Sequence, residues 1–276
     1  MTAQSSRPPP SIFITGAAAG IGRAVAERFA REGWVLGLWD VDEAGVQALQ
    51  RDLQARYQHP AGGPLPIVAG RLDVCDAEGW ASALERFAAL TGGQMGVLFN
   101  NAGVAVTSPF EAAELSRHLR LIDINLKGVV NGCHAAHSLL KRTPGSRVIN
   151  MCSASALYGQ PELSTYAATK AAVRSLTEAL NIEWARQGIR VMDVLPLFVN
   201  TAMVTDEVSR MKTTKALGVR LTADDVAATV WRLASQAPWR LPVHAYVGGQ
   251  TRLFAFLSKV SPGFINRLVT ARMAGY

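Results

Sequence analysis

Tyr166 and Lys170, four residues apart, are the side chains in this sequence best suited to moving a proton. On a helix, that spacing places both on one face, one turn apart. Ser153 lies thirteen residues before the tyrosine, directly after an apolar run at 147–151 that predicts a buried strand. A phenol titrates near ~10 in water, and a neighbouring ammonium group lowers that pKa. The three groups together predict proton transfer to an alcohol or carbonyl oxygen, which the serine would hold. A surface turn is the alternative, because Tyr-x-x-x-Lys is common by chance.

A glycine-rich turn near the start of the chain is typical of phosphate binding. An apolar strand is expected at 11–15 and a helix at 23–31, and between them stand Gly16, Gly20, Ile21 and Gly22. Glycines let the backbone approach a pyrophosphate, and the helix N-terminus supplies free N–H groups. An ordinary tight turn is the alternative, but the strand–helix context favours phosphate binding.

Asp40 ends the next expected strand, 34–39. A carboxylate about 20 residues beyond such a glycine turn accepts hydrogen bonds from a ribose 2′-hydroxyl, and it would repel a 2′-phosphate. Its alternative role is to cap the following helix, 41–57, for which Asp42 is better placed. The position of Asp40 therefore favours NAD as the cofactor.

Two later strands also end in polar residues. Asp73 follows the strand at 66–72, and the strand at 95–99 runs into Asn100-Asn101-Ala102-Gly103. Parallel α/β sheets bind their ligands at the carboxyl ends of the strands. Asparagine-rich turns are also common without any ligand, so this segment alone leaves both readings open.

A long helix is expected at 119–142, and Asn125 lies inside it. Asparagine is unfavourable within a helix unless its amide has a specific partner. His134 and His137 share that helix, but no third ligand stands at metal spacing. We therefore predict no metal site.

Strands and helices alternate along the whole chain, which predicts an α/β fold with a parallel sheet covered on both faces. Further strands are expected at 189–195 and 244–247, with a helix capped by Thr222 between them. Residues 1–10 read as a disordered lead, 11–249 as a single catalytic domain, and 250–276 as a C-terminal amphipathic extension.

The composition excludes several classes of protein. Of the 276 residues, 49% are apolar and 18% charged, which is enough to fill a core. The three cysteines lack metal spacing and suit a reduced, cytoplasmic compartment. The sequence contains no run of eighteen apolar residues, so no membrane span is expected. The net charge of +7 is concentrated after Gly249, so it predicts no nucleic-acid partner.

In this order and context, the motifs resemble the short-chain dehydrogenase/reductases, the single-domain Rossmann branch. The resemblance covers 11–249 and implies a Rossmann-type doubly wound sheet of about seven strands. It implies that Tyr166 is the acid/base, that Lys170 lowers its pKa and binds the nicotinamide ribose, and that Ser153 polarises the substrate oxygen. Asn125 is expected to hold a water that links Lys170 to solvent.

The resemblance also implies which residues contact the dinucleotide. Asp73 and Val74 are expected beside the adenine, Asn101 beside the adenosine ribose, and Thr201 near the nicotinamide amide. The full expected cofactor set is Gly16, Gly20, Ile21, Gly22, Asp40, Asp73, Val74, Asn101, Ala102, Gly103, Tyr166, Lys170, Pro196, Val199 and Thr201.

Two features depart from the family pattern. Leu197 follows Pro196 where the family usually has glycine, so the loop near the nicotinamide is expected to run differently. The extension 250–276 mixes four basic residues with many large apolar ones, among them Leu253, Phe254, Phe256, Leu257, Phe264, Ile265, Leu268 and Val269. A packed helix, a lid over an apolar pocket and a weak membrane-surface contact are all open readings.

We therefore predict an oxidoreductase that transfers a hydride between NAD(H) and an apolar secondary alcohol or ketone, acting as a homo-oligomer (dimer or tetramer). A catalytically silent dinucleotide-binding sensor or scaffold is the alternative. An epimerase or dehydratase on a related fold fits the glycine spacing and chain length less well. The candidate pocket residues are mostly apolar: Val104, Leu157, Tyr158, Leu163, Phe198, Met203 and Val204. Three nearby cations, Arg210, Lys212 and Lys215, are by default solvated loop charges, and contact with an acidic substrate tail is the alternative.

Overall fold

The computed structural model describes residues 10–201, 208, 211–237 and 240–276. Most of the expected lead at 1–10 lies outside these residues. So do Met203, Val204 and Arg210.

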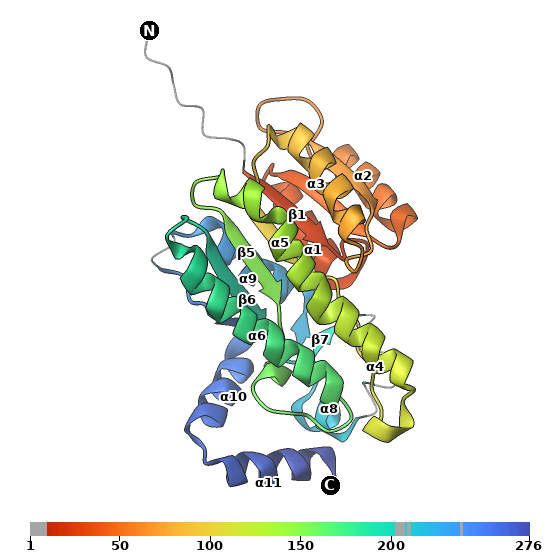
Figure 1. Ribbon diagram of the computed structural model, residues 1–276, viewed down its shortest axis with the longest axis vertical. Helices are drawn as coiled ribbons and strands as arrows, with labels where there is room; N and C mark the ends of the chain where they lie inside the picture. Colours follow the sequence, from red (N-terminus) through yellow and green to blue (C-terminus); the bar gives the residue numbers. More distant parts are fainter. Residues whose placement is uncertain (1–9, 202–207, 209–210, 238–239) are drawn as a thin grey trace.

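A seven-stranded parallel sheet forms the centre of the molecule, in the order β3-β2-β1-β4-β5-β6-β9 (Figure 1). Each strand is a short, mainly apolar run with both faces covered, which is why the sequence pattern locates it well. The predicted α/β fold with a doubly wound parallel sheet is confirmed. The strands are β1 (Ser11–Thr15), β2 (Val35–Asp40), β3 (Ile67–Arg71), β4 (Val97–Asn100), β5 (Arg147–Met151), β6 (Arg190–Leu195) and β9 (His244–Tyr246).

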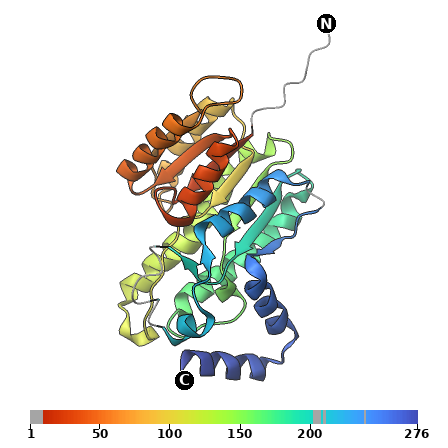
Figure 2. The ribbon, with the colours of Figure 1, turned by 180° about the vertical axis from the view of Figure 1, so that it is seen from behind.

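Helices cover both faces of the sheet (Figures 1 and 2). Alternate residues of β1 show the division, since Ile12 and Ile14 join one apolar core and Phe13 joins the other. The first core is closed by α1 (Gly20–Arg31), α2 (Glu43–Arg56) and α9 (Ala223–Ser235). The second is closed by α3 (Ala77–Thr91), α5 (Gly128–Lys141) and α6 (Ser164–Ala185).

The prediction of one continuous helix at 119–142 is wrong, because the structure divides this segment into three parts. α4 (Leu115–Ile122) leads into a π-helical turn (Asp123–Lys127), and α5 follows. A π-turn inserts one extra residue into the helix and re-aims the side chains around it. Here it contains Asn125, whose amide bonds to the backbone of a neighbouring loop rather than facing outward.

Several short elements lie outside the central sheet and its covering helices. They are two 3₁₀ turns (Phe110–Ala112 and Ala154–Ala156), the strand pair β7 (Val199–Asn200) and β8 (Leu221–Thr222), and α8 (Lys212–Leu217). Thr222 caps α9 as expected, in a reciprocal capping box with Asp225.

Two helices form an arm at the C-terminus, and we call α10 (Gly248–Val260) and α11 (Gly263–Ala274) the arm throughout. Both views show it at the lower end of the molecule, below the sheet (Figures 1 and 2). The glycine pair expected to close the last strand instead begins α10, with Gly248 at a φ of +78°. No helix in the described ranges is both long and apolar enough to cross a membrane.

Candidate active site

A cavity of about 440 Å³ lies at the carboxyl ends of the parallel strands. Its lining includes Gly16 after β1, Asp40 at the end of β2, Asn101 after β4, Met151 at the end of β5 and Pro196 after β6. The polar strand ends that stand far apart in the sequence therefore meet at one place.

Ser153, Tyr166 and Lys170 line this cavity together. Ser153 follows β5, while Tyr166 and Lys170 occupy the first two turns of α6. The Ser153 hydroxyl donates to Ser155 Oγ and accepts from the Ser155 N–H, both at 3.2 Å, and it lies close enough to Tyr166 to lower the pKa of the phenol. The Lys170 Nζ lies 5.6 Å from the centroid of the Tyr166 ring and donates to the Met151 carbonyl at 2.8 Å. The structure therefore brings the serine, tyrosine and lysine side chains together at one cavity, as predicted.

The electrostatics differ from the sequence expectation. Burial raises the pKa of Tyr166 to about 12, and the neighbouring Ser153 hydroxyl offsets this only in part. Tyr166 keeps some exposed surface because it lines the cavity, yet protein surrounds the phenol closely enough for desolvation to dominate. Burial also lowers the pKa of Lys170, which disfavours its own charge. The expected lowering of the tyrosine pKa by the lysine is therefore absent from this state, and the phenol is protonated at neutral pH.

Asn125 is fully buried behind the cavity and does not line it. Its Oδ1 accepts from the Val104 N–H and its Nδ2 donates to the Val104 carbonyl, both at 2.8 Å. Gly103 lies between Asn125 and Lys170, since a Cβ there would sit 3.1 Å from Asn125 Oδ1 and 3.8 Å from Lys170 Nζ. The side-chain amide thus positions the loop beside the lysine.

The glycine turn is shaped to receive an anion. Gly20 has a φ of +55°, which favours glycine, and Gly22 packs so tightly that a Cβ would lie 2.0 Å from the Gly16 carbonyl oxygen. The N-terminus of α1 has no capping side chain and no acid in its first turn, and Ala19, Gly20 and Ile21 line the cavity. Uncapped N–H groups beside a cavity suit a phosphate. Gly22 itself stands outside the lining and keeps the turn closed.

Asp42, and not Asp40, caps α2, as expected. Asp42 caps α2 by accepting from the Gly45 N–H at 2.9 Å. Asp40 lines the cavity, and its two oxygens accept from the N–H groups of Ala18 at 3.0 Å and Asp42 at 3.1 Å. These bonds hold the carboxylate at the rim beside the glycine turn.

Asn101 has a structural task in this state. Its Nδ2 donates to the carbonyls of Thr15 at 2.9 Å and Gly16 at 3.0 Å, which ties the end of β4 to the glycine turn. Asn101 still lines the cavity, as do the other expected cofactor residues apart from Gly22.

Several expectations for the substrate end need correction. Val104, Tyr158, Leu163 and Phe198 line the cavity, but Leu157 does not. Lys212 and Lys215 are also outside the lining, whereas Arg120 of α4, which the sequence did not indicate, lines it in addition to Lys170. Sequence spacing did not indicate Arg120, because spacing alone does not show which residues of a helix border a cavity.

Leu197 stands where the family usually has glycine. It lines the cavity without a positive φ, while the Pro196 carbonyl accepts from the Ala154 N–H at 2.8 Å. The loop thus follows a path that a leucine can adopt. Sequence reasoning also missed the lining residues Ser155 and Gln160. The arm contributes Phe254, Thr270 and Met273, which fits the lid reading of the extension.

Comparisons with known proteins agree with this geometry. The sequence profile described as short chain dehydrogenase matches residues 10–212. The chain is 32% identical over 264 residues to the 3beta-hydroxysteroid dehydrogenase 1 of Eggerthella lenta, covering 92% of this chain and 95% of that protein. It is 35% identical over 238 residues to a short-chain type dehydrogenase/reductase of Sinorhizobium fredii, of which it spans only 41%.

A solved structure shares the fold. The 3-ketoacyl-(acyl-carrier-protein) reductase of Brucella melitensis, crystallised with NADH, superposes with a TM-score of 0.77 at 27% identity, over 89% of this chain and 100% of that one. The profile match, the 32% identity over nearly the full length and the shared fold lead to one conclusion: this chain belongs to the short-chain dehydrogenase family of oxidoreductases.

Proposed function

We propose that this protein transfers a hydride between NAD(H) and an apolar secondary alcohol or ketone. The observation that carries the proposal is that Ser153, Tyr166 and Lys170 line the same cavity as the glycine turn and Asp40. One continuous space can then hold a dinucleotide and a substrate oxygen together. Two of the similar proteins, a hydroxysteroid dehydrogenase of Eggerthella lenta and a ketoacyl reductase of Brucella melitensis, support alcohol and ketone chemistry.

The residues around the cavity fit a nicotinamide dinucleotide. The uncapped start of α1 would hold the phosphates, and Asp40 would accept from the adenosine ribose hydroxyls. Asp73 and Val74 would flank the adenine, and Lys170 would bind the nicotinamide ribose. Pro196, Val199 and Thr201 would stand near the carboxamide. When bound, the cofactor supplies or accepts the hydride.

The chain's own residues handle the proton. In ketone reduction, Ser153 donates a hydrogen bond to the carbonyl oxygen, and Tyr166 gives its phenolic proton to that same oxygen as it becomes a hydroxyl. In alcohol oxidation, the phenolate form of Tyr166 takes the hydroxyl proton. Because the phenol pKa is about 12 in this state, the protonated form that serves reduction is already present at neutral pH.

The substrate end of the cavity favours an apolar molecule. Its walls include Tyr158, Leu163, Leu197 and Phe198 from the main body, and Phe254 and Met273 from the arm. We propose that residues 11–249 act as one catalytic domain and that the extension 250–276 closes its substrate side.

NADH absorbance tests the proposal. A panel of apolar secondary alcohols with NAD and the matching ketones with NADH should give turnover with some members. Cofactor binding, followed by NADH fluorescence, provides the control. Tight dinucleotide binding without turnover on any compound would favour the silent sensor or scaffold instead.

A further inference from the structure

The outward face of α10 is apolar and uncovered. Leu253, Phe256, Leu257 and Val260 are between 48% and 63% exposed. Their spacing of three, four and seven residues puts them on one stripe of the helix. Thr251 and Ala255, on the opposite side, are buried against the body.

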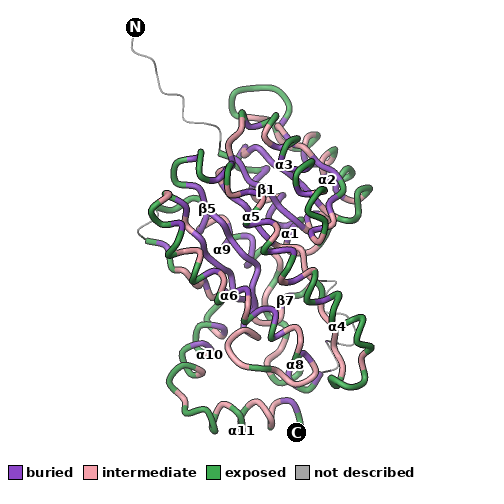
Figure 3. Tube along the Cα trace, in the orientation of Figure 1, coloured by how far each residue is buried: buried purple, intermediate pink, exposed green. Residues whose placement is uncertain are grey.

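α11 repeats this arrangement. Phe264, Ile265, Leu268 and Val269 are between 37% and 72% exposed, on the side away from the cavity-lining Thr270 and Met273. Figure 3 shows how much of the arm is exposed compared with the buried strands of the sheet. Eight large apolar side chains therefore face outward from two consecutive helices, which is unusual for a surface that stays in water.

The arm is held in place by specific contacts. Asn266 Nδ2 donates to the carbonyls of Ser258 at 2.9 Å and Ser261 at 3.4 Å, which fixes the corner between the two helices. Gln250 Nε2 donates to the Leu217 carbonyl at 2.9 Å and attaches the start of α10 to α8. Because Phe254 and Met273 form the cavity wall, the inner side is already in use. The exposed apolar face on the outer side of the arm is therefore the surface available to a partner.

The charge on the arm indicates which partner. Its ionisable side chains are all cations, Arg252, Lys259, Arg267 and Arg272, and the sequence has no acid after Asp225. Among the described residues, none of these four forms an ion pair. Arg252 and Lys259 are seven residues apart, so they share one side of α10. Long basic side chains beside an apolar stripe can bury their stems while their charges reach lipid headgroups.

A second copy of the chain fits this surface less well. Two arms packed face to face would bring eight cations together with no arm carboxylate to neutralise them. An anionic lipid surface satisfies both features, because acyl chains receive the apolar stripe and headgroups meet the cations. We propose that the arm attaches this protein to the surface of an anionic membrane, with α10 and α11 lying in the interface rather than crossing it.

This attachment has a consequence for the cavity. The same two helices that face the lipid contribute Phe254, Thr270 and Met273 to its wall. The bilayer would therefore lie next to the substrate side, where an apolar alcohol or ketone collects. This last step rests on the proposed function, whereas the attachment does not.

Flotation of the full-length protein with vesicles tests the attachment without any turnover. One set of vesicles is phosphatidylcholine alone, and the other mixes phosphatidylcholine and phosphatidylglycerol in equal parts. We expect flotation with the mixed vesicles and little with phosphatidylcholine. The double variant Arg252→Gln, Lys259→Gln should weaken binding by about fivefold for each cation removed. The double variant Phe256→Gln, Leu268→Gln should weaken it by about tenfold or more.

Matched variants elsewhere provide the controls. Lys141→Gln with Arg142→Gln removes two exposed cations at the far end of α5, and Ile182→Gln removes an apolar side chain on α6 that is 76% exposed. Both should float like the wild type. Failure to float with mixed vesicles, or equal losses in arm and control variants, would overturn the proposal. So would light scattering in which Phe256→Gln, Leu268→Gln converts a dimer to a monomer, since a second copy would then cover the arm.

Discussion

The protein around Tyr166 keeps its phenol protonated at neutral pH. Burial raises the pKa of its phenol to about 12, and the neighbouring Ser153 hydroxyl lowers that pKa only in part. The Lys170 ammonium lies 5.6 Å from the ring centroid but directs a hydrogen bond to the Met151 carbonyl. A protonated phenol beside a serine hydroxyl suits donation to a carbonyl oxygen.

Replacing Tyr166 by phenylalanine removes the transferable proton and little else. Turnover should fall by about 10²–10⁴-fold, the usual share of a general acid or base, while NADH binding is retained. Steady-state kinetics and NADH fluorescence measure the two effects. Tyr158→Phe, which deletes a phenol from the same cavity, is the matched control. Turnover near the wild-type rate in Tyr166→Phe would show that another group moves the proton.

Asp40 should determine which cofactor is used. A carboxylate at the cavity rim repels a 2′-phosphate, so NADPH should bind about tenfold more weakly than NADH, or worse. Asp40→Asn removes that repulsion and should narrow the difference. Fluorescence titrations with both reduced cofactors measure it. Equal or tighter NADPH binding by the wild type would contradict this assignment.

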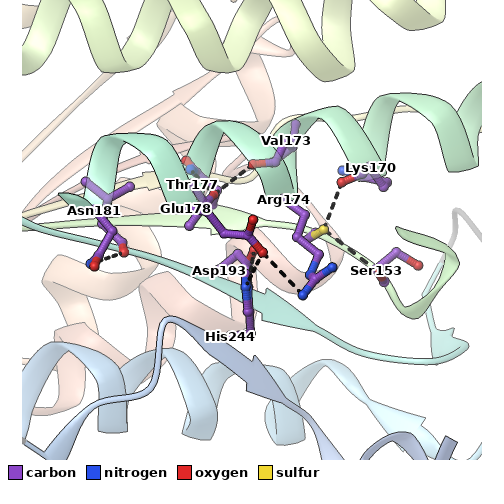
Figure 4. A network of polar contacts seen from close by, with 12 residues as sticks. Ser153, Lys170, Val173, Arg174, Thr177, Glu178, Asn181, Asp193 and His244 are labelled. Atoms are coloured by element: carbon purple, nitrogen blue, oxygen red, sulfur yellow. Dashed lines mark hydrogen bonds and ion pairs between the residues drawn. The ribbon is translucent and has the colours of Figure 1, made fainter. Parts of the chain in front are cut away.

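At the scale of elements, a histidine holds the last strand in place. His244 of β9 lies between two carboxylates, with Nδ1 2.9 Å from Asp193 Oδ1 on β6 and Nε2 2.8 Å from Glu178 Oε1 on α6 (Figure 4). Arg174, one turn before Glu178, pairs with it at 3.3 Å. Because β9 has only three residues, these bonds are a large part of what attaches it.

The protonation of this cluster predicts a pH dependence of stability. Burial lowers the pKa of His244, but the hydrogen bond and charge of Asp193 outweigh burial and raise it above the ordinary value. Burial raises the pKa of Asp193, against the hydrogen bond and charge of His244. In both groups the folded state holds its proton more tightly than the unfolded state does. The resulting stability is present below the unfolded histidine pKa, near ~6.5, and is lost as the pH rises through the raised folded pKa.

Denaturant titrations across this range measure the effect. The free energy of unfolding should fall as the pH rises above about 6.5, and His244→Gln should flatten that fall. His59→Gln, on a loop far from the cluster, should leave the slope unchanged. A wild-type stability that stays level or increases over the same range would rule out this role for His244.

Elements built from buried apolar runs were predictable, because both faces of a parallel strand need such residues. β1 and β5 have the expected bounds, and Thr222 and Asp42 cap the helices assigned to them. Features that depend on tertiary contacts were not. The π-turn at Asn125 accompanies side-chain hydrogen bonds to Val104, which is distant in sequence. The raised pKa of Tyr166 arises from burial that no local spacing reveals.

For the whole molecule, the main result is that the extension belongs to the cavity. Its lining includes Phe254, Thr270 and Met273, whereas every expected cofactor residue precedes residue 202. The sequence indicated that the extension must cover something but not which side would do so. A homo-oligomer remains a prediction that light scattering can measure.

Removal of residues 261–276 should affect substrate binding without affecting cofactor binding. The Michaelis constant for an apolar ketone should rise by about tenfold, because Thr270 and Met273 leave the wall. NADH affinity should stay the same. Steady-state kinetics and fluorescence titration measure the pair of effects. Met273→Ala should show the same trend, while Leu268→Ala, on the outer face of α11, should not. A truncated protein with unchanged kinetics would mean that the extension is passive.

The position of the arm also orders events during synthesis. A chain leaves the ribosome from its N-terminus, so the glycine turn, Asp40 and the first turns of α6 emerge well before α11 does. The part of the cavity that these residues line can therefore form on a nascent chain whose arm has not yet emerged. Met273 can reach its place only after α11 has left the ribosome, so a chain terminated before α11 would lack that part of the cavity wall.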